Sequence, residues 1–90
     1  MRIHYEISRR MVKNELDHYV DSKPSLTREQ SIAEWIDLKF KAWIIQNITD
    51  DETKFDIEPV TNVPEGFKVT FVNDSDGTRF LSLLGGNKDD

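Results

Sequence analysis

The organising segment of this chain is residues 25–48, which read SLTREQSIAEWIDLKFKAWIIQNI. It is the longest stretch with an unbroken helical period, and it holds both tryptophans. Thr27 is the expected N-cap, because its hydroxyl can accept a hydrogen bond from a first-turn amide that has no partner within the helix. Gln30, three residues later, completes a capping box. The sequence therefore predicts a long central helix that begins after Thr27.

This central helix is expected to carry two apolar faces. At about 100° per residue, one face collects the large apolar side chains that should form the core, namely Ile32, Ile36, Phe40 and Trp43, with Ala33, Trp35 and Ile44 on its shoulders. Leu38, Ala42 and Ile45 project to nearly the opposite side. A helix on the outside of a small domain should be polar there, so the second face predicts either a cover or a partner.

Three readings of the second face remain open: a cover formed by the N-terminal part of the same chain, a contact with another molecule, and simple exposure. A contact between two copies would make the protein a homodimer through the central helix. The candidate interface then consists of Leu38, Ala42 and Ile45, with Trp35 at its border.

The N-terminal part is expected to supply a strand and a helix. Ile3, Tyr5 and Ile7 alternate with polar residues over 2–8, which is typical of a half-buried strand, although these residues could also belong to the first helix. Residues 9–20 then follow a helical period, with Ser8 available as a cap. Pro24 interrupts the helical pattern in a short link, so the two helices should pack antiparallel.

The C-terminal half is expected to be β-structure. Residues 54–60 and 67–71 alternate as strands, and 62–66 has turn chemistry. Residues 67–84 then read as a hairpin, with Gly77 in the left-handed position of the 73–77 turn and residues 78–84 as the returning strand. These segments predict a three-stranded antiparallel meander packed on the central helix.

The predicted fold is therefore α+β: a short N-terminal strand, two antiparallel helices, and a three-stranded meander on the second helix. Residues 1–84 should form one domain, and 85–90 a flexible C-terminal tail.

Charge is divided unevenly along the chain, whose net charge is −5. Residues 1–45 hold eight basic and seven acidic side chains, whereas 46–90 hold four basic and ten acidic ones. Direct nucleic-acid binding is disfavoured, because an acidic surface repels phosphates. The candidate acidic surface consists of Asp50, Asp51, Glu52, Asp56, Glu58, Asp74 and Asp76.

The chain has no cysteine, so it holds no disulfide framework and no thiolate metal site. No apolar run approaches the roughly 20 residues that cross a bilayer, and the first ten residues lack the apolar core of a signal peptide. We expect a cytoplasmic protein with no membrane contact.

Motifs that carry chemistry are weak. The 73–77 segment fails as a calcium loop, because aligning Gly77 with the sixth position puts Val72 and Leu83 at ligand positions. His4 and His18 show no metal-binding or catalytic spacing, and no nucleophile elbow or glycine-rich phosphate loop is present. We expect no cofactor and no enzymatic activity.

Three functional hypotheses follow. The first is a small non-catalytic interaction or regulatory protein with an unknown protein partner. The second is an acidic inhibitor that imitates nucleic acid and occupies a basic site on a DNA- or RNA-handling protein. The third is a small enzyme that uses carboxylates with His4 or His18.

Overall fold

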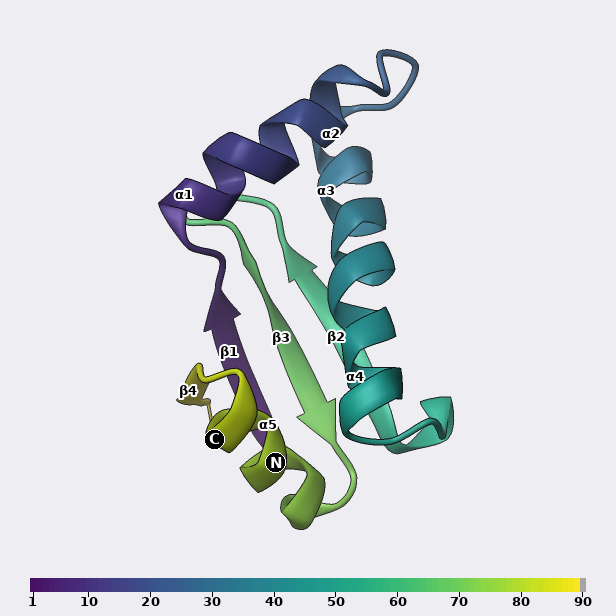
Figure 1. Cartoon of the computed structure of the whole chain (residues 1–90), viewed down its shortest axis with the longest axis vertical. Coiled ribbons are helices and arrows are strands. Elements are labelled where there is room, and N and C mark those ends of the chain that lie inside the picture. The colour runs from purple at the N-terminus through teal and green to yellow at the C-terminus, as the bar shows by residue number, and fades with distance from the viewer. Residues whose placement is uncertain (90) are drawn as a thin grey trace.

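The computed structural model describes residues 1–89 of the chain. The chain folds into one sheet and several helices, and helices separate most of the strands along the sequence (Figure 1). The strands are β1 (Arg2–Glu6), β2 (Phe55–Val60), β3 (Gly66–Phe71) and β4 (Asn87–Lys88). The first helix runs through α1 (Arg9–Met11), η1 (Val12–Leu16) and α2 (Asp17–Asp21), and the central helix through α3 (Arg28–Ile36), η2 (Asp37–Lys41) and α4 (Ala42–Asn47). A short η3 (Glu52–Lys54) precedes β2, and α5 (Asp74–Leu83) follows β3.

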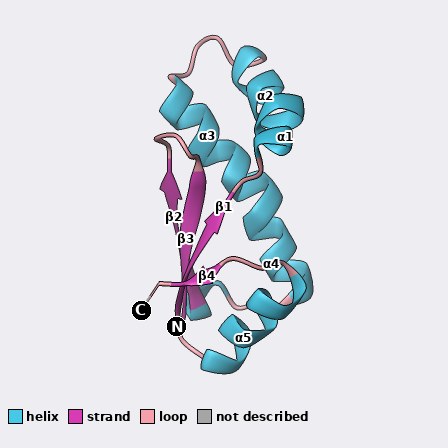
Figure 2. Ribbon diagram, turned by 90° about the vertical axis from the view of Figure 1, so that its left-hand side faces the viewer, coloured by secondary structure: helices cyan, strands magenta, loops and turns pink. Residues whose placement is uncertain are grey.

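The sheet has the order β2-β3-β1-β4, and each neighbouring pair is antiparallel. β3 is flanked on both sides, with Val69 opposite Ile57 of β2 and Ile3 of β1. The predicted α+β class, with an N-terminal strand and an antiparallel sheet, is confirmed. Figure 2 shows the helices gathered along one side of the sheet, so the chain forms two layers.

The central helix supplies the middle of the core. Thr27 and Gln30 form the predicted capping box, in which each side chain bonds the other residue's backbone amide. Four buried apolar positions on this helix recur every four residues: Ile32, Ile36, Phe40 and Ile44.

A four-residue spacing drifts around a regular α-helix, but the wider π-helical turn of η2 returns it to the sheet. The prediction that Trp43 lies in the core stripe and Ile44 on its shoulder was therefore wrong by one residue. Ile44 is fully buried and Trp43 only partly.

The first helix is capped by Ser8, whose hydroxyl accepts a hydrogen bond from the Met11 amide at 3.2 Å. Its contacts with the central helix run antiparallel, through Asp17 to Arg28 and Glu15 to Lys39. This side of the central helix is not the Leu38 side. Leu38 is 61% exposed, so the reading in which the first helix covers it is wrong.

The predicted hairpin over 67–84 is the main error. Residues 74–83 form helix α5, and β1, not a returning strand, lies beside β3. Gly77 has no positive φ and is buried against Met1, whereas Phe80 packs its ring edge on Trp43. The buried and half-buried apolar positions of 74–84 have helical spacing: Gly77, Phe80, Leu81 and Leu84.

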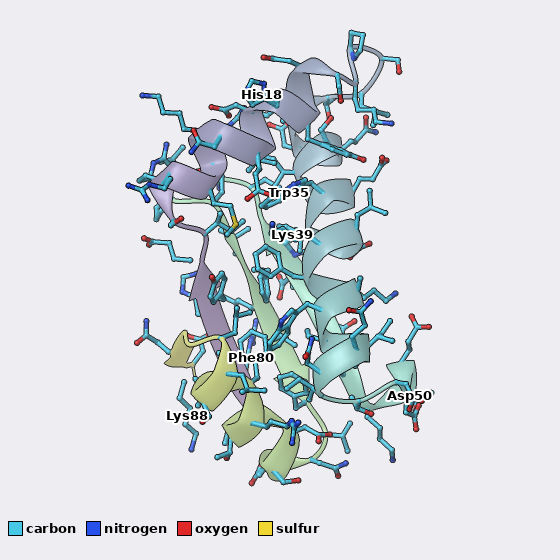
Figure 3. All side chains as sticks on the ribbon, in the orientation of Figure 1. His18, Trp35, Lys39, Asp50, Phe80 and Lys88 are labelled. Carbon is cyan, nitrogen blue, oxygen red and sulfur yellow. The ribbon has the colours of Figure 1, made fainter. Side chains whose placement is uncertain are left out.

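α5 packs against β1 and β3 and closes one end of the core. The side chain of Phe80 points from α5 into this core (Figure 3). The chain then turns through Gly85 and Gly86, both with positive φ. A flexible tail was expected over 85–90, but Asn87–Lys88 pair with β1 as β4 and the Asp89 amide donates to the Arg2 carbonyl at 2.8 Å. Residue 90 lies outside the described residues.

Candidate functional site

The two longer strands that flank β3 differ in how many strands pair with them. β1 has β3 on one side and β4 on the other, whereas β2 stands at the end of the sheet and, within residues 1–89, pairs with β3 alone. β2 therefore presents one row of backbone groups without a strand partner. Such a row is a template for pairing with another chain.

The hydrogen-bond alternation identifies the outward groups. The Val72 amide donates to the Lys54 carbonyl at 2.9 Å, so positions 54 and 72 are in hydrogen-bonding register, although the Lys54 amide donates to the Asp51 carbonyl. In an antiparallel ladder such pairs alternate. Asp56, Glu58 and Val60 are thus bonded to β3, whereas the backbone groups of Phe55, Ile57 and Pro59 point away from it. Pro59 lacks an N–H, so it offers only its carbonyl.

A shallow hollow of about 220 Å³ lies beside this edge, between the central helix and β2. Its apolar lining comes from Phe55 and Ile57, whose side chains lie on the core face of β2. Its charged lining is predominantly acidic: Asp37, Glu52 and Asp56 against Lys41.

Lys41 forms an ion pair with only one of these acids, and it interacts with Asp37 at longer range. Its ammonium lies 2.8 Å from the Glu52 carboxylate, and this hydrogen bond is the main reason that the pKa of Lys41 is raised. Among residues 1–89, neither Asp37 nor Asp56 has an ion-pair partner within 4.0 Å. The hollow therefore has a negative field to offer to a cation.

The predicted acidic surface is only partly one surface. Asp50 lies in the loop after α4 (Figure 3), and Asp51 caps η3 by accepting from the Thr53 hydroxyl and amide, which lowers the pKa of Asp51. Together with Glu52, these residues lie next to the start of β2, which carries Asp56 and Glu58. Asp74 and Asp76 lie on α5 instead, which packs against β1 and β3.

The face of the sheet that the helices leave uncovered (Figure 2), called the bare face below, carries a small network of charged side chains. Arg2 of β1 contacts Glu58 at 3.1 Å and Asp89 at 3.7 Å, and Lys68 of β3 contacts Asp89 at 3.5 Å. These side chains are partly exposed, so each pair adds little stability. Glu58 keeps a side-chain exposure of 66% and remains accessible from the β2 edge.

The predicted helix interface does not form one exposed patch. Leu38 projects into solvent, Ala42 and Ile45 are half-buried, and Trp35 is 6% exposed and packs its ring edge on Phe40. Trp35 is thus a core residue in this structure. Leu38 is the one member of the four that is largely exposed.

A buried acid, Glu65, was missed by the sequence analysis. Its carboxylate is inaccessible to solvent and accepts hydrogen bonds from the guanidinium groups of Arg9 at 2.8 Å and Arg28 at 2.9 Å. These two arginines lie in the first turns of the two long helices. Burial alone would raise the pKa of Glu65, but hydrogen bonds from its own backbone amide and from Arg28 and Arg9 outweigh it and lower the pKa. The signal in the sequence was the unfavourable positive charge in two helix N-terminal turns, which asks for a compensating anion.

The histidines lie apart from the hollow. His4 is on β1, with a buried Nε2 that has no hydrogen-bond partner among residues 1–89, and His18 is exposed on α2 (Figure 3). No group of three or more histidine or acidic side chains in the described part of the chain is placed to hold a metal ion. No helix within residues 1–89 is long and apolar enough to span a bilayer.

Comparison with known proteins identifies no relative: the chain matches no protein-family model, no curated protein and no solved structure.

Proposed function

We propose that this chain is a small non-catalytic binding protein that recognises a positively charged protein partner through the β2 edge. The observation that carries the proposal is the unpaired edge of β2 beside an acidic hollow. An open edge offers directional backbone hydrogen bonds, and the carboxylates favour cationic partners and disfavour anionic ones.

The size of the hollow supports a macromolecular partner over a small metabolite. Pockets that enclose small ligands usually span about 300–1,000 Å³ and bury most of the ligand surface. The hollow beside β2 is smaller, at about 220 Å³. It suits a single side chain of a partner whose other contacts are made along the strand.

The edge carries more support than the two other binding hypotheses. A homodimer through the central helix would rest mainly on Leu38, and single exposed apolar residues are common on monomers. A nucleic-acid mimic would present its acids along one surface, but Asp74 and Asp76 lie on α5, apart from the acids near β2. The β2 edge combines charge with hydrogen-bonding geometry.

The test compares partner capture by three forms of the immobilised chain in nuclease-treated lysate of its source cells. These are the wild type, D56N/E58Q on β2, and the control E6Q/D21N, which removes the same charge from exposed positions on β1 and α2. We expect a protein that the wild type and the control retain and the β2 variant loses. Equal capture by all three forms would contradict the proposal.

A further inference from the structure

We propose that the β2 edge binds its partner by β-strand addition, and that the added segment is extended and carries lysine or arginine at alternate positions. The inference rests on the proposed function and deepens it, because it names the chemistry of the segment and the atoms that hold it.

The backbone of β2 defines the pairing. Phe55 and Ile57 each direct an N–H and a C=O away from β3, so each can form a complete hydrogen-bonded pair with one partner residue. Pro59 adds a carbonyl and no donor. The structure therefore offers pairing sites for a segment of about five residues, because hydrogen-bonded residues alternate along the strand.

The side chains of an added strand would meet two different environments. Residues opposite Phe55 and Ile57 would point to the helix side, where the apolar atoms of these two residues line the hollow. Residues opposite Asp56 and Glu58 would point to the bare face of the sheet, directly beside the two carboxylates. Opposite charges at such positions stabilise a strand pair, and like charges destabilise it. The segment should thus alternate basic and apolar residues.

Charge disfavours a second copy of this chain in the register that pairs Ile57 with Ile57, the centre of the outward backbone groups. Two antiparallel β2 strands centred on Ile57 would set Asp56 of each copy opposite Glu58 of the other. Both cross-strand pairs would then be acid against acid, in addition to the two acidic hollows. In this register a basic segment of another protein therefore fits the edge better than a second copy does.

The first experiment is a fluorescence anisotropy titration of the full chain with labelled acetyl-Thr-Lys-Val-Lys-Val-Lys-Thr-amide at low salt. Two matched probes accompany it: one with glutamate in place of each lysine, and one with N-methyl groups on the peptide nitrogens that would face β2. We expect saturable binding of the lysine probe and none of the glutamate probe. The N-methylated probe should bind about tenfold more weakly or worse, because its backbone donors are lost.

Variants of the protein separate backbone pairing from charge. I57P removes an outward N–H without removing a bond to β3, and I57A controls for the loss of the side chain. I57P should bind the lysine probe about tenfold more weakly than I57A. D56N/E58Q should weaken binding roughly fivefold, and E6Q/D21N less than twofold.

Two results would overturn the inference. One is equal binding of the N-methylated and unmodified lysine probes, which would mean that charge alone holds the peptide. The other is the absence of saturable binding of the lysine probe. In either case a partner captured from lysate through β2 would still stand, so strand addition can fail while the proposed function survives.

Discussion

The two edges of the sheet differ in whether their outward backbone groups have a strand partner. The β1 edge is closed: Gly85 and Gly86 turn the chain back, β4 pairs with β1, and Asp89 contacts Arg2 and Lys68. The β2 edge has no strand partner among residues 1–89. The residues on this strand that limit unwanted pairing are Pro59 and the two acids Asp56 and Glu58. Within residues 1–89 the longer edge is thus the open one, and it is the edge that we propose for recognition.

The largest expected loss of stability comes from replacing Phe80, which lies on the helix that packs against β1 and β3. Replacing it with alanine should lower the free energy of unfolding by about 4 kcal/mol, because the ring is fully buried against Trp43, Phe71 and Phe67 and its loss leaves a cavity. Urea unfolding measures the change. L83A on the exposed side of α5 is the control and should change stability by about 0.5 kcal/mol or less. A loss below about 1 kcal/mol for F80A would mean that α5 does not hold this end of the core.

The next largest effect should come from Glu65, which joins the start of β3 to both long helices. E65Q should destabilise the fold at pH 7 by about 2–3 kcal/mol, because two guanidinium groups lose their buried anion; both are partly exposed and can turn to water, which limits the loss. The measurement is urea unfolding over a range of pH.

The sign of the pH dependence follows from the lowered pKa of Glu65. A depressed folded pKa means that the stability from the carboxylate is fully present above its ordinary value of 4.5 and is lost as pH falls through the lower folded value. The difference between wild type and E65Q should therefore shrink below pH 4.5. E29Q, on an exposed acid of α3, controls for general charge effects. A constant difference down to pH 2 would contradict the ionised clamp.

A smaller change should open the β1 edge. G86A places a methyl group 2.9 Å from the His4 carbonyl oxygen in a backbone with φ +101°, whereas G85A meets nothing within 4 Å at φ +105°. Both variants carry backbone strain, so the difference between them isolates the contact with β1. We expect G86A to be less stable by about 1 kcal/mol than G85A and to self-associate more in light scattering, since β4 no longer covers β1. Equal behaviour would show that β4 does not protect this edge.

The smallest expected effect concerns the helix face opposite the core. L38E should change stability by about 0.5 kcal/mol or less and leave the molar mass in solution unchanged, because Leu38 is already exposed. Sizing with light scattering measures the mass, and L38A is the control for side-chain loss. Conversion of a dimer to a folded monomer by L38E alone would restore the central helix as a self-association surface.

The sequence predicted the elements that local signals specify. The capping box at Thr27, the cap at Ser8 and the alternation over 2–8, 54–60 and 67–71 all depend on neighbours a few residues apart. The structure has helices after both caps and strands over most of the three segments. The 78–84 segment misled because a short apolar run fits both periods. Asn73, Asp74 and Asp76 signalled a helix start as well as a turn, and the helix places Phe80 over the open end of the core.

The site depends on contacts that a sequence does not order. β2 is an edge strand because β1 pairs with β3 and not with β2, and this pairing joins residues 60 to 68 positions apart. Glu65 lies 56 positions from Arg9 and 37 from Arg28, so no local pattern joins them. The excess of acids in the second half was visible in the sequence, but their division between the β2 region and α5 was not.

Amide hydrogen exchange along β2, followed by NMR with and without the lysine peptide, tests the open edge most directly. In the free protein, Phe55 and Ile57 should exchange rapidly, and Asp56 and Glu58 slowly, because only the latter two donate to β3. Saturating peptide should slow the exchange of Phe55 and Ile57 alone. Slow exchange of these two amides in the free protein, or no slowing with peptide, would contradict an edge that is open for strand addition.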